Sequence, residues 1–175
     1  GSTGSRRPIV TSADLDGRIF SLSPDGQWLL YTRKPSSNQK EIINSLWVVS
    51  LNQEKPEPLD LKVNNVVHSA GWMPNRTMTI LYSTVEPRAT APGWQANNDL
   101  HILRFYESGR TQNTTILETN AGGIYGWWGM TFLPSPDGAQ IAYTRPDGIG
   151  LVDTEKGLSR SLAEILPFQT GAEWA

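Results

Sequence analysis

Short runs of apolar or alternating residues, separated by turn residues, follow one another along the whole chain, and helical periodicity is nearly absent. The first group of runs is Arg18–Leu22, Gln27–Arg33, Ser45–Leu51 and Glu57–Leu61. The second group is Val66–Trp72, Thr77–Ser83, Asp99–Phe105 and Thr114–Glu118. The third group is Gly129–Leu133, Gln140–Thr144, Ile149–Asp153 and Ser159–Leu162. The pattern predicts an all-β protein made of three units of four strands each.

Two stretches predict the same β-hairpin in the first and third units. They read FSLSPDGQWLLYTR (Phe20–Arg33) and FLPSPDGAQIAYTR (Phe132–Arg145). In a type I turn the serine hydroxyl bonds the backbone ahead, proline presets φ at the second position, and glycine accepts the positive φ that follows. We therefore predict two matching structural turns, formed by Ser23, Pro24, Asp25 and Gly26 and by Ser135, Pro136, Asp137 and Gly138.

A degenerate copy of the hairpin lies between them, in Ala70–Thr84. It keeps the aromatic residue and the proline, but Asn75 replaces the aspartate and Arg76 replaces the glycine. Asparagine is one of the few residues that tolerate the left-handed conformation, so Asn75 is expected to adopt it.

The strand Trp28–Tyr31 is apolar at every position, as in sheets that are covered on both faces. Repeated four-stranded antiparallel sheets that cover one another describe a β-propeller. We expect the first two sheets to pack through Trp28, Leu30 and Trp47. The expected blades span residues 14–62, 63–119 and 124–165, with the start of a fourth at 168–175, inside a propeller segment of residues 6–175. Residues 1–5 are interpreted as a cloning tag.

The two hairpin stretches, with SLWVVSL and GIGLVDT downstream of them, resemble the WD-like Pro-Asp-Gly propeller repeat of TolB-type proteins. The resemblance implies a non-catalytic, extracytoplasmic binding module that docks a protein or peptide partner. Similar blades form the propellers of prolyl-oligopeptidase-like serine peptidases. The alternative function is therefore a gating propeller whose hydrolase domain lies outside this chain.

Three blades do not close a ring, since propellers usually have about 4–8. The two terminal sheets would each leave an apolar face without a partner in the chain, at a cost of about 25 cal/mol per Å². We therefore expect either a larger ring of six to eight blades or closure by identical copies.

Composition narrows the classes of partner. The 175 residues carry a formal net charge of −2 and no cysteine. A near-neutral chain lacks the clustered positive charge of a nucleic-acid-binding domain, so no nucleic acid partner is expected. The absence of cysteine excludes a disulfide scaffold and a thiol nucleophile. No apolar run reaches the roughly 18 residues that span a membrane, so no membrane span is expected.

Motifs of catalysis are missing from the sequence. It contains no Gly-x-Ser-x-Gly elbow, no phosphate-binding Gly-x-x-x-x-Gly-Lys-Ser/Thr loop, and no His-x-x-x-His pair for zinc. We accordingly predict no catalytic residues, no cofactor and no metal, and hence no enzyme activity in this chain.

Strand order places the longer connections at one end of the sheets. Successive antiparallel strands reverse direction, so the connections Lys34–Asn44, Thr84–Asn98 and Thr119–Trp127 share one end, here called the loop rim. The Ser-Pro-Asp-Gly turns share the opposite end, the turn rim. Long loops on a rigid scaffold are where binding usually occurs. The candidate binding residues are Trp94, Tyr125, Trp127, Trp128, His68 and Arg88. The alternative for Trp94, Trp127 and Trp128 is packing within the propeller, and for His68 it is an ordinary position on a strand.

Overall fold

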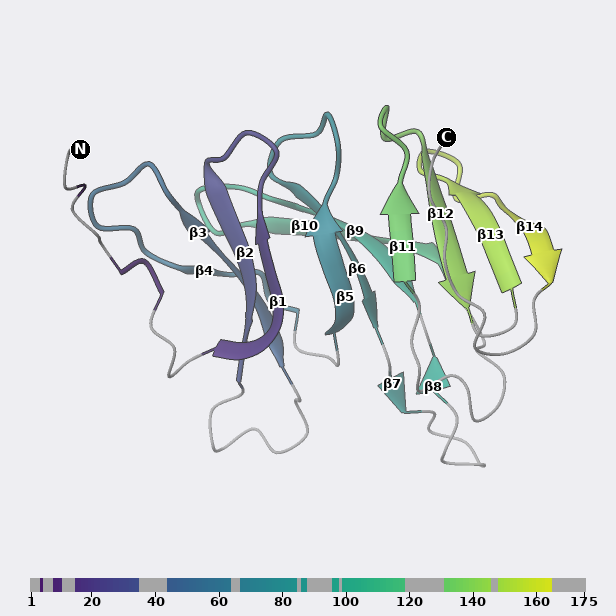
Figure 1. Cartoon of the computed structure of the whole chain (residues 1–175), viewed down its shortest axis with the longest axis horizontal. Coiled ribbons are helices and arrows are strands. Elements are labelled where there is room, and N and C mark those ends of the chain that lie inside the picture. The colour runs from purple at the N-terminus through teal and green to yellow at the C-terminus, as the bar shows by residue number, and fades with distance from the viewer. Residues whose placement is uncertain are drawn as a thin grey trace.

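Three four-stranded antiparallel sheets follow one another along the chain in the computed structural model (Figure 1). The structure describes residues 4, 8–10, 15–34, 44–63, 67–84, 86–87, 96–97, 99–118, 131–145 and 148–164. These residues contain no helix. The predicted all-β class is therefore confirmed.

Each sheet is an antiparallel meander in which consecutive strands of that sheet pair with one another. The first sheet has the order β1-β2-β3-β4, with β1 Leu15–Leu22, β2 Trp28–Arg33, β3 Ser45–Ser50 and β4 Leu59–Asp60. The second has the order β10-β9-β6-β5, with β5 Val67–Trp72, β6 Thr79–Thr84, β9 Leu100–Phe105 and β10 Thr111–Leu117. The third has the order β11-β12-β13-β14, with β11 Thr131–Pro134, β12 Gln140–Arg145, β13 Gly148–Asp153 and β14 Ser159–Glu164. All twelve predicted strands are found, with ends shifted by no more than three residues.

A short ribbon interrupts the connection from β6 to β9, which the sequence pattern predicted as a loop. Strand β7 (Glu86–Pro87) pairs antiparallel with β8 (Ala96–Asn97). Figure 1 shows this ribbon below the second sheet. The prediction failed here because two-residue strands carry no readable alternation of apolar and polar positions.

Both Ser-Pro-Asp-Gly turns have the predicted geometry. The Gly26 N–H donates to the Ser23 carbonyl at 2.9 Å, and Gly26 has a φ of +70°. The Ser23 hydroxyl oxygen accepts hydrogen bonds from the N–H groups of Gln27 at 3.1 Å and Trp28 at 2.9 Å. The second turn repeats this, with Gly138 also at φ +70°.

The degenerate turn is adapted to its neighbour. Asn75 has a φ of +56°, which confirms the predicted left-handed conformation. Its side-chain amide donates to the Pro136 carbonyl at 2.6 Å, so the turn of the second sheet is bonded to the turn of the third. The asparagine that replaces the repeat's aspartate thus joins two sheets.

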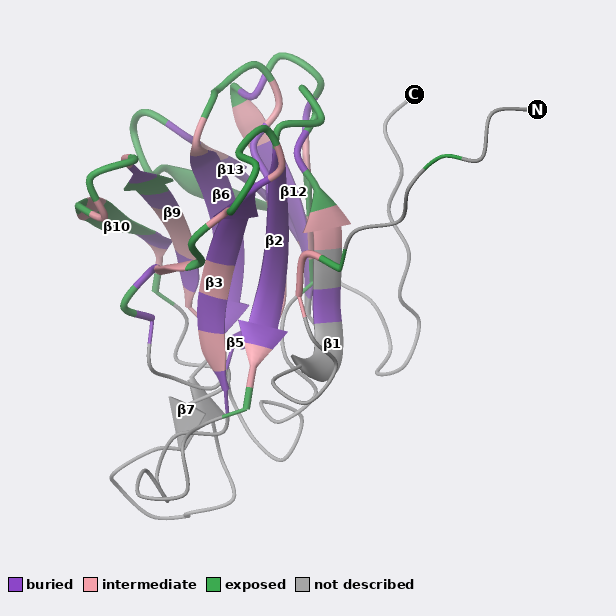
Figure 2. Ribbon diagram, turned by 90° about the vertical axis from the view of Figure 1, so that its left-hand side faces the viewer, coloured by how far each residue is buried: buried purple, intermediate pink, exposed green. Residues whose placement is uncertain are grey.

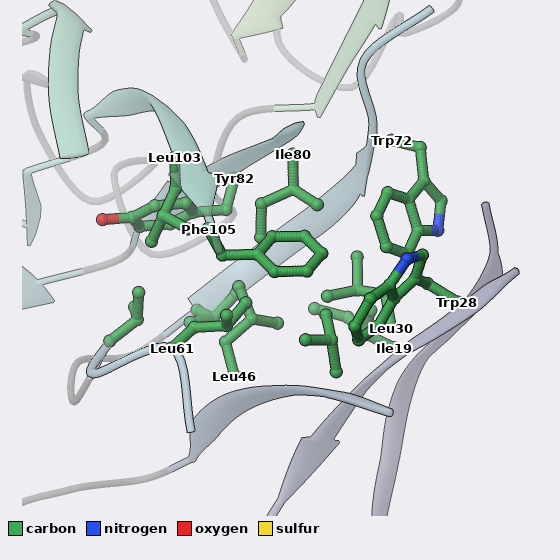
Figure 3. Close-up of a cluster of buried hydrophobic side chains, with 13 residues drawn as sticks. Ile19, Trp28, Leu30, Leu46, Leu61, Trp72, Ile80, Tyr82, Leu103 and Phe105 are labelled. Carbon is green, nitrogen blue, oxygen red and sulfur yellow. The ribbon is translucent and has the colours of Figure 1, made fainter. Parts of the chain in front are cut away.

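Four aromatic and nine aliphatic buried side chains form the core between the first and second sheets (Figure 3). Trp28 meets the Phe105 ring edge-on, with centroids 5.2 Å apart, and Trp72 lies beside Trp28, with its ring centroid 6.1 Å from that of Phe105. The Trp72 indole N–H donates to the Ser21 carbonyl at 3.1 Å across the interface. The predicted inter-sheet roles of Trp28 and Leu30 are confirmed.

Trp47, by contrast, faces away from the second sheet, so its predicted role was wrong. Trp47 pairs directly with Tyr31, whereas Leu30 pairs with Val48. Directly paired residues share a sheet face, so Trp47 lies with Tyr31 on the outer face. There the Arg33 guanidinium lies 4.4 Å from the Trp47 ring centroid. The prediction failed because the strand is apolar at consecutive positions, so its sequence does not show which side chains point to which face of the sheet.

The outer face of the first sheet was expected to have no partner within the chain, and this was also wrong. Ile9 and Val10 pack against the buried side chains of Leu29, Tyr31 and Val49. The segment that precedes the first strand therefore covers part of this face. Leu22, at the turn end of the same face, remains 56% exposed.

A second core joins the second and third sheets. Its buried members are Met73, Leu81, Leu100, Ile116, Ile141, Tyr143 and Val152. The Tyr143 ring lies over Gly150, its directly paired residue on the next strand, so closely that a Cβ at Gly150 would lie 2.3 Å from the ring. The second sheet is thus covered on both faces, and its strand β6 is buried at every position.

Candidate binding rims

The two ends of the sheets differ in structure. Figure 1 shows the tight turns β1–β2, β5–β6 and β11–β12 together at the top, and the β7–β8 ribbon at the opposite end. Figure 2 shows mostly exposed residues along the turn-bearing edge above largely buried strands. The predicted separation into a turn rim and a loop rim agrees with this strand order.

A buried asparagine anchors the loop rim where residues 34–44 rejoin the first sheet. The Asn44 side-chain amide donates to the Val67 carbonyl at 3.1 Å, and its carbonyl oxygen accepts from the Val67 N–H at 2.9 Å. Asn44 has no exposed surface, so these two bonds take the place of the hydrogen bonds that its side chain would make to water. This reciprocal pair fixes the start of β3 against the start of β5.

The β7–β8 ribbon is anchored at its base in the second sheet. The Thr84 N–H donates to the Asp99 carbonyl at 3.0 Å, and the Asp99 N–H donates to the Thr84 hydroxyl at 3.4 Å. The two ends of the β6–β9 connection are therefore hydrogen-bonded to each other where they leave and re-enter the sheet.

Of the predicted binding residues, the structure describes His68 alone. His68 lies on β5, half-buried. Trp94, Tyr125, Trp127, Trp128 and Arg88 lie outside the described residues, so their part in binding stays a prediction.

A polar cluster that the sequence did not indicate lies around the second histidine. The His101 ring stacks on Tyr82, with centroids 4.6 Å apart and an interplanar angle of 11°. Asn113 donates to the Tyr82 hydroxyl at 2.6 Å, and Thr115 is bonded to His101 Nδ1 at 3.0 Å. Burial lowers the pKa of His101 below its ordinary value, although the nearby charge of Asp99 raises it. The imidazole is therefore neutral at physiological pH and serves to order the strands β9 and β10.

The aspartates of the two repeated turns have a structural role. Hydrogen bonds from the Ser23 hydroxyl and, next, from the Gln27 N–H lower the pKa of Asp25 below its ordinary value of 3.8. The Ser135 hydroxyl and the Ala139 N–H lower the pKa of Asp137 in the same way. The serine hydroxyl lies 2.5 Å from the carboxylate in both turns. These carboxylates therefore stabilise the turn conformation.

No grouping of three His, Asp or Glu side chains that could hold a metal ion occurs within the described ranges. The same ranges contain no helix long and apolar enough to cross a membrane. The sequence matches no protein-family model, and comparison with curated proteins finds no significant relative.

Proposed function

We propose that this chain forms blades of a TolB-like β-propeller and acts as a non-catalytic platform that binds a protein or peptide partner on its loop rim. The resemblance of its repeats also leads us to propose an extracytoplasmic location. Three consecutive four-stranded meanders, each packed face to face on the next, support the propeller part of the proposal.

One observation supports the binding part: the strand ends that the long connections join and the tight turns lie at opposite ends of the sheets. Tight, internally bonded turns at one end leave little adaptable surface there. Long connections anchored at their bases, as at Asn44 and Thr84, can present side chains at the other end without loosening the scaffold.

Closure of the ring is part of the same proposal. The third sheet exposes Leu133 at 38% and Leu162 at 51%. A further blade, from the same protein or from an identical copy, would cover such side chains. Because the first sheet is partly covered by Ile9 and Val10, the incoming blade would have to pack beside or displace that segment.

The test compares binding by variants of the two rims. Proteins or peptides that co-purify with the chain are identified, purified, and titrated against Trp94→Ala, Trp127→Ala and the matched control Leu158→Ala. Leu158 is 68% exposed at the β13–β14 turn and is not on the loop rim. Loss of a central aromatic anchor costs about 2 kcal/mol or more, so binding should weaken at least about tenfold in the loop-rim variants and stay unchanged in the control.

The proposal is wrong if the Trp94→Ala, Trp127→Ala double variant still binds every ligand that the parent chain binds. It is also wrong if Leu158→Ala alone reduces the affinity.

A further inference from the structure

A polar hollow of about 400 Å³ lies at the turn end of the second sheet, on the face turned toward the third sheet. Arg76, Arg104, Gln112 and Thr114 line it, together with the buried Thr79. Cross-strand pairing assembles this set, since Arg104 pairs with Thr79 on one side and with Gln112 on the other. The hollow is therefore built on the ladder of β6, β9 and β10.

The hollow is lined by two positively charged side chains. Besides Arg76 and Arg104, Arg110 lies close by, since the guanidinium groups of Arg104 and Arg110 both lie against the Tyr106 ring, at 5.2 and 4.3 Å from its centroid. In the part of the chain that the structure describes, no carboxylate is ion-paired with any of these three arginines. The chain as a whole has a net charge of −2, so this positive end is a local feature.

Contacts restrain both guanidinium groups that line the hollow. Arg76 Nη2 donates to the Thr154 hydroxyl at 3.3 Å, a bond that reaches across to the third sheet. The Tyr106 ring supports Arg104. In the facing turn of the third sheet, the Asp153 carboxylate accepts the backbone N–H groups of Glu155 and Lys156 at 2.9 and 2.8 Å.

We propose that this hollow binds a small-molecule anion through a phosphate or carboxylate group. Guanidinium groups match both oxyanions with two parallel N–H donors, and the amide of Gln112 and the hydroxyls of Thr79 and Thr114 add neutral donors. The volume is at the lower end of the range of small-ligand sites, about 300–1,000 Å³. The site is at the turn end, so it does not rest on the proposed function of the loop rim.

Calorimetric titration of the 175-residue chain at low salt tests the proposal, with inorganic phosphate and succinate as the two probes. The variants are Arg104→Gln and Arg76→Gln, and the matched control is Arg160→Gln. Arg160 is an exposed arginine that pairs with Leu151, on the face of the third sheet that points away from the hollow. Circular dichroism establishes that each variant is folded.

We expect saturable one-to-one binding of at least one probe, at least tenfold weaker in Arg104→Gln and in Arg76→Gln, and unchanged in Arg160→Gln. Binding of phosphate alone identifies a phosphoryl ligand, and binding of succinate alone identifies a carboxylate ligand. Arg104→Lys should recover only part of the affinity, because an ammonium group lacks the planar fork. In ¹⁵N-labelled protein the amide shifts caused by the probe should be confined to β6, β9, β10 and the adjoining turns.

The inference is overturned if neither probe binds the parent chain. It is equally overturned if Arg160→Gln weakens binding as much as Arg104→Gln does, because the anion would then respond only to total charge.

Discussion

Alanine at Gly138 should destabilise the protein more than alanine at Gly26, although the two glycines close turns of the same sequence. Both have a φ of +70°. A Cβ built at Gly26 meets no heavy atom within 4 Å, whereas a Cβ at Gly138 would lie 3.0 Å from the Pro74 carbonyl oxygen. The difference between the two substitutions in the free energy of unfolding therefore measures the effect of the contact between neighbouring turns.

The expected magnitudes follow from the backbone and from this contact. Positive φ costs an alanine about 1–2 kcal/mol, and the smaller conformational freedom of alanine in the unfolded chain returns about 0.4–1 kcal/mol. Gly26→Ala should thus lower the free energy of unfolding by about 1 kcal/mol. At Gly138 the new methyl group must also displace a backbone carbonyl, in a turn that the Asn75 amide holds to Pro136 at 2.6 Å. Overpacking of this kind costs about 1–3 kcal/mol, so Gly138→Ala should cost about 2 kcal/mol or more in total.

Urea unfolding, followed by tryptophan fluorescence and linear extrapolation, measures both free energies under the same conditions. Gly109→Ala serves as the matched control, because Gly109 has a φ of +80° and a Cβ there also meets no heavy atom within 4 Å. Gly109→Ala and Gly26→Ala should agree within about 0.5 kcal/mol.

Equal destabilisation by the Gly26 and Gly138 substitutions would refute this reasoning, because it would mean that the turns of the second and third sheets are not in contact. A stabilising effect of Gly26→Ala would refute the assignment of positive φ.

Four further predictions concern other parts of the chain. Gly150→Ala should cost about 2 kcal/mol in urea unfolding, because its Cβ would displace the Tyr143 ring from the second core; a neutral result would contradict the stacking. Asn44→Ala should cost about 2–3 kcal/mol in the same assay, since it leaves a buried N–H and carbonyl unpaired, and an effect below about 0.5 kcal/mol would show that water replaces the amide. Because the folded-state pKa of Asp25 is lowered, its stabilising contribution is complete above the ordinary value of 3.8 and is lost as the pH falls through the folded pKa; the urea midpoint should drop in acid, and less steeply in Asp25→Asn. The exposed leucines of the terminal sheets should make the 19.4 kDa chain associate, and a monodisperse monomer in light scattering would count against ring closure.

Local turn chemistry explains how much of the fold could be read from the sequence. Serine, proline, aspartate and glycine each satisfy one backbone requirement of the hairpin, so the turns at residues 23–26 and 135–138 were predicted together with the positive φ of their glycines. The strands on either side of them follow directly. The orientation of the sheet faces did not follow, because Trp28–Tyr31 is apolar at every position. Only the contacts of Leu30 and Tyr31 in two separate clusters show which side is outer.

The arginine-lined hollow shows what sequence reasoning missed at the level of sites. Arg76, Arg104 and Gln112 belong to a turn and two strands, and only the cross-strand register brings them together. The sequence shows Arg104 between the apolar residues Leu103 and Phe105, as on a strand with one exposed face. A single exposed arginine on a strand does not indicate a binding site unless the residues beside it in the sheet are known. The loop-rim aromatic residues were the stronger signal, and they remain a prediction.

The burial of the second sheet on both faces has a consequence for how the protein opens. In a linear array of sheets, each sheet contacts only its neighbours, so stability is close to a sum of nearest-neighbour interfaces. The amides of β6, buried along its whole length, can exchange with solvent only when two interfaces are lost together. Those of β14, at the edge of an end sheet, need lose only one. Hydrogen exchange should therefore be slowest in the centre of the array and should define a cooperative unit around β6, from which the end sheets detach first.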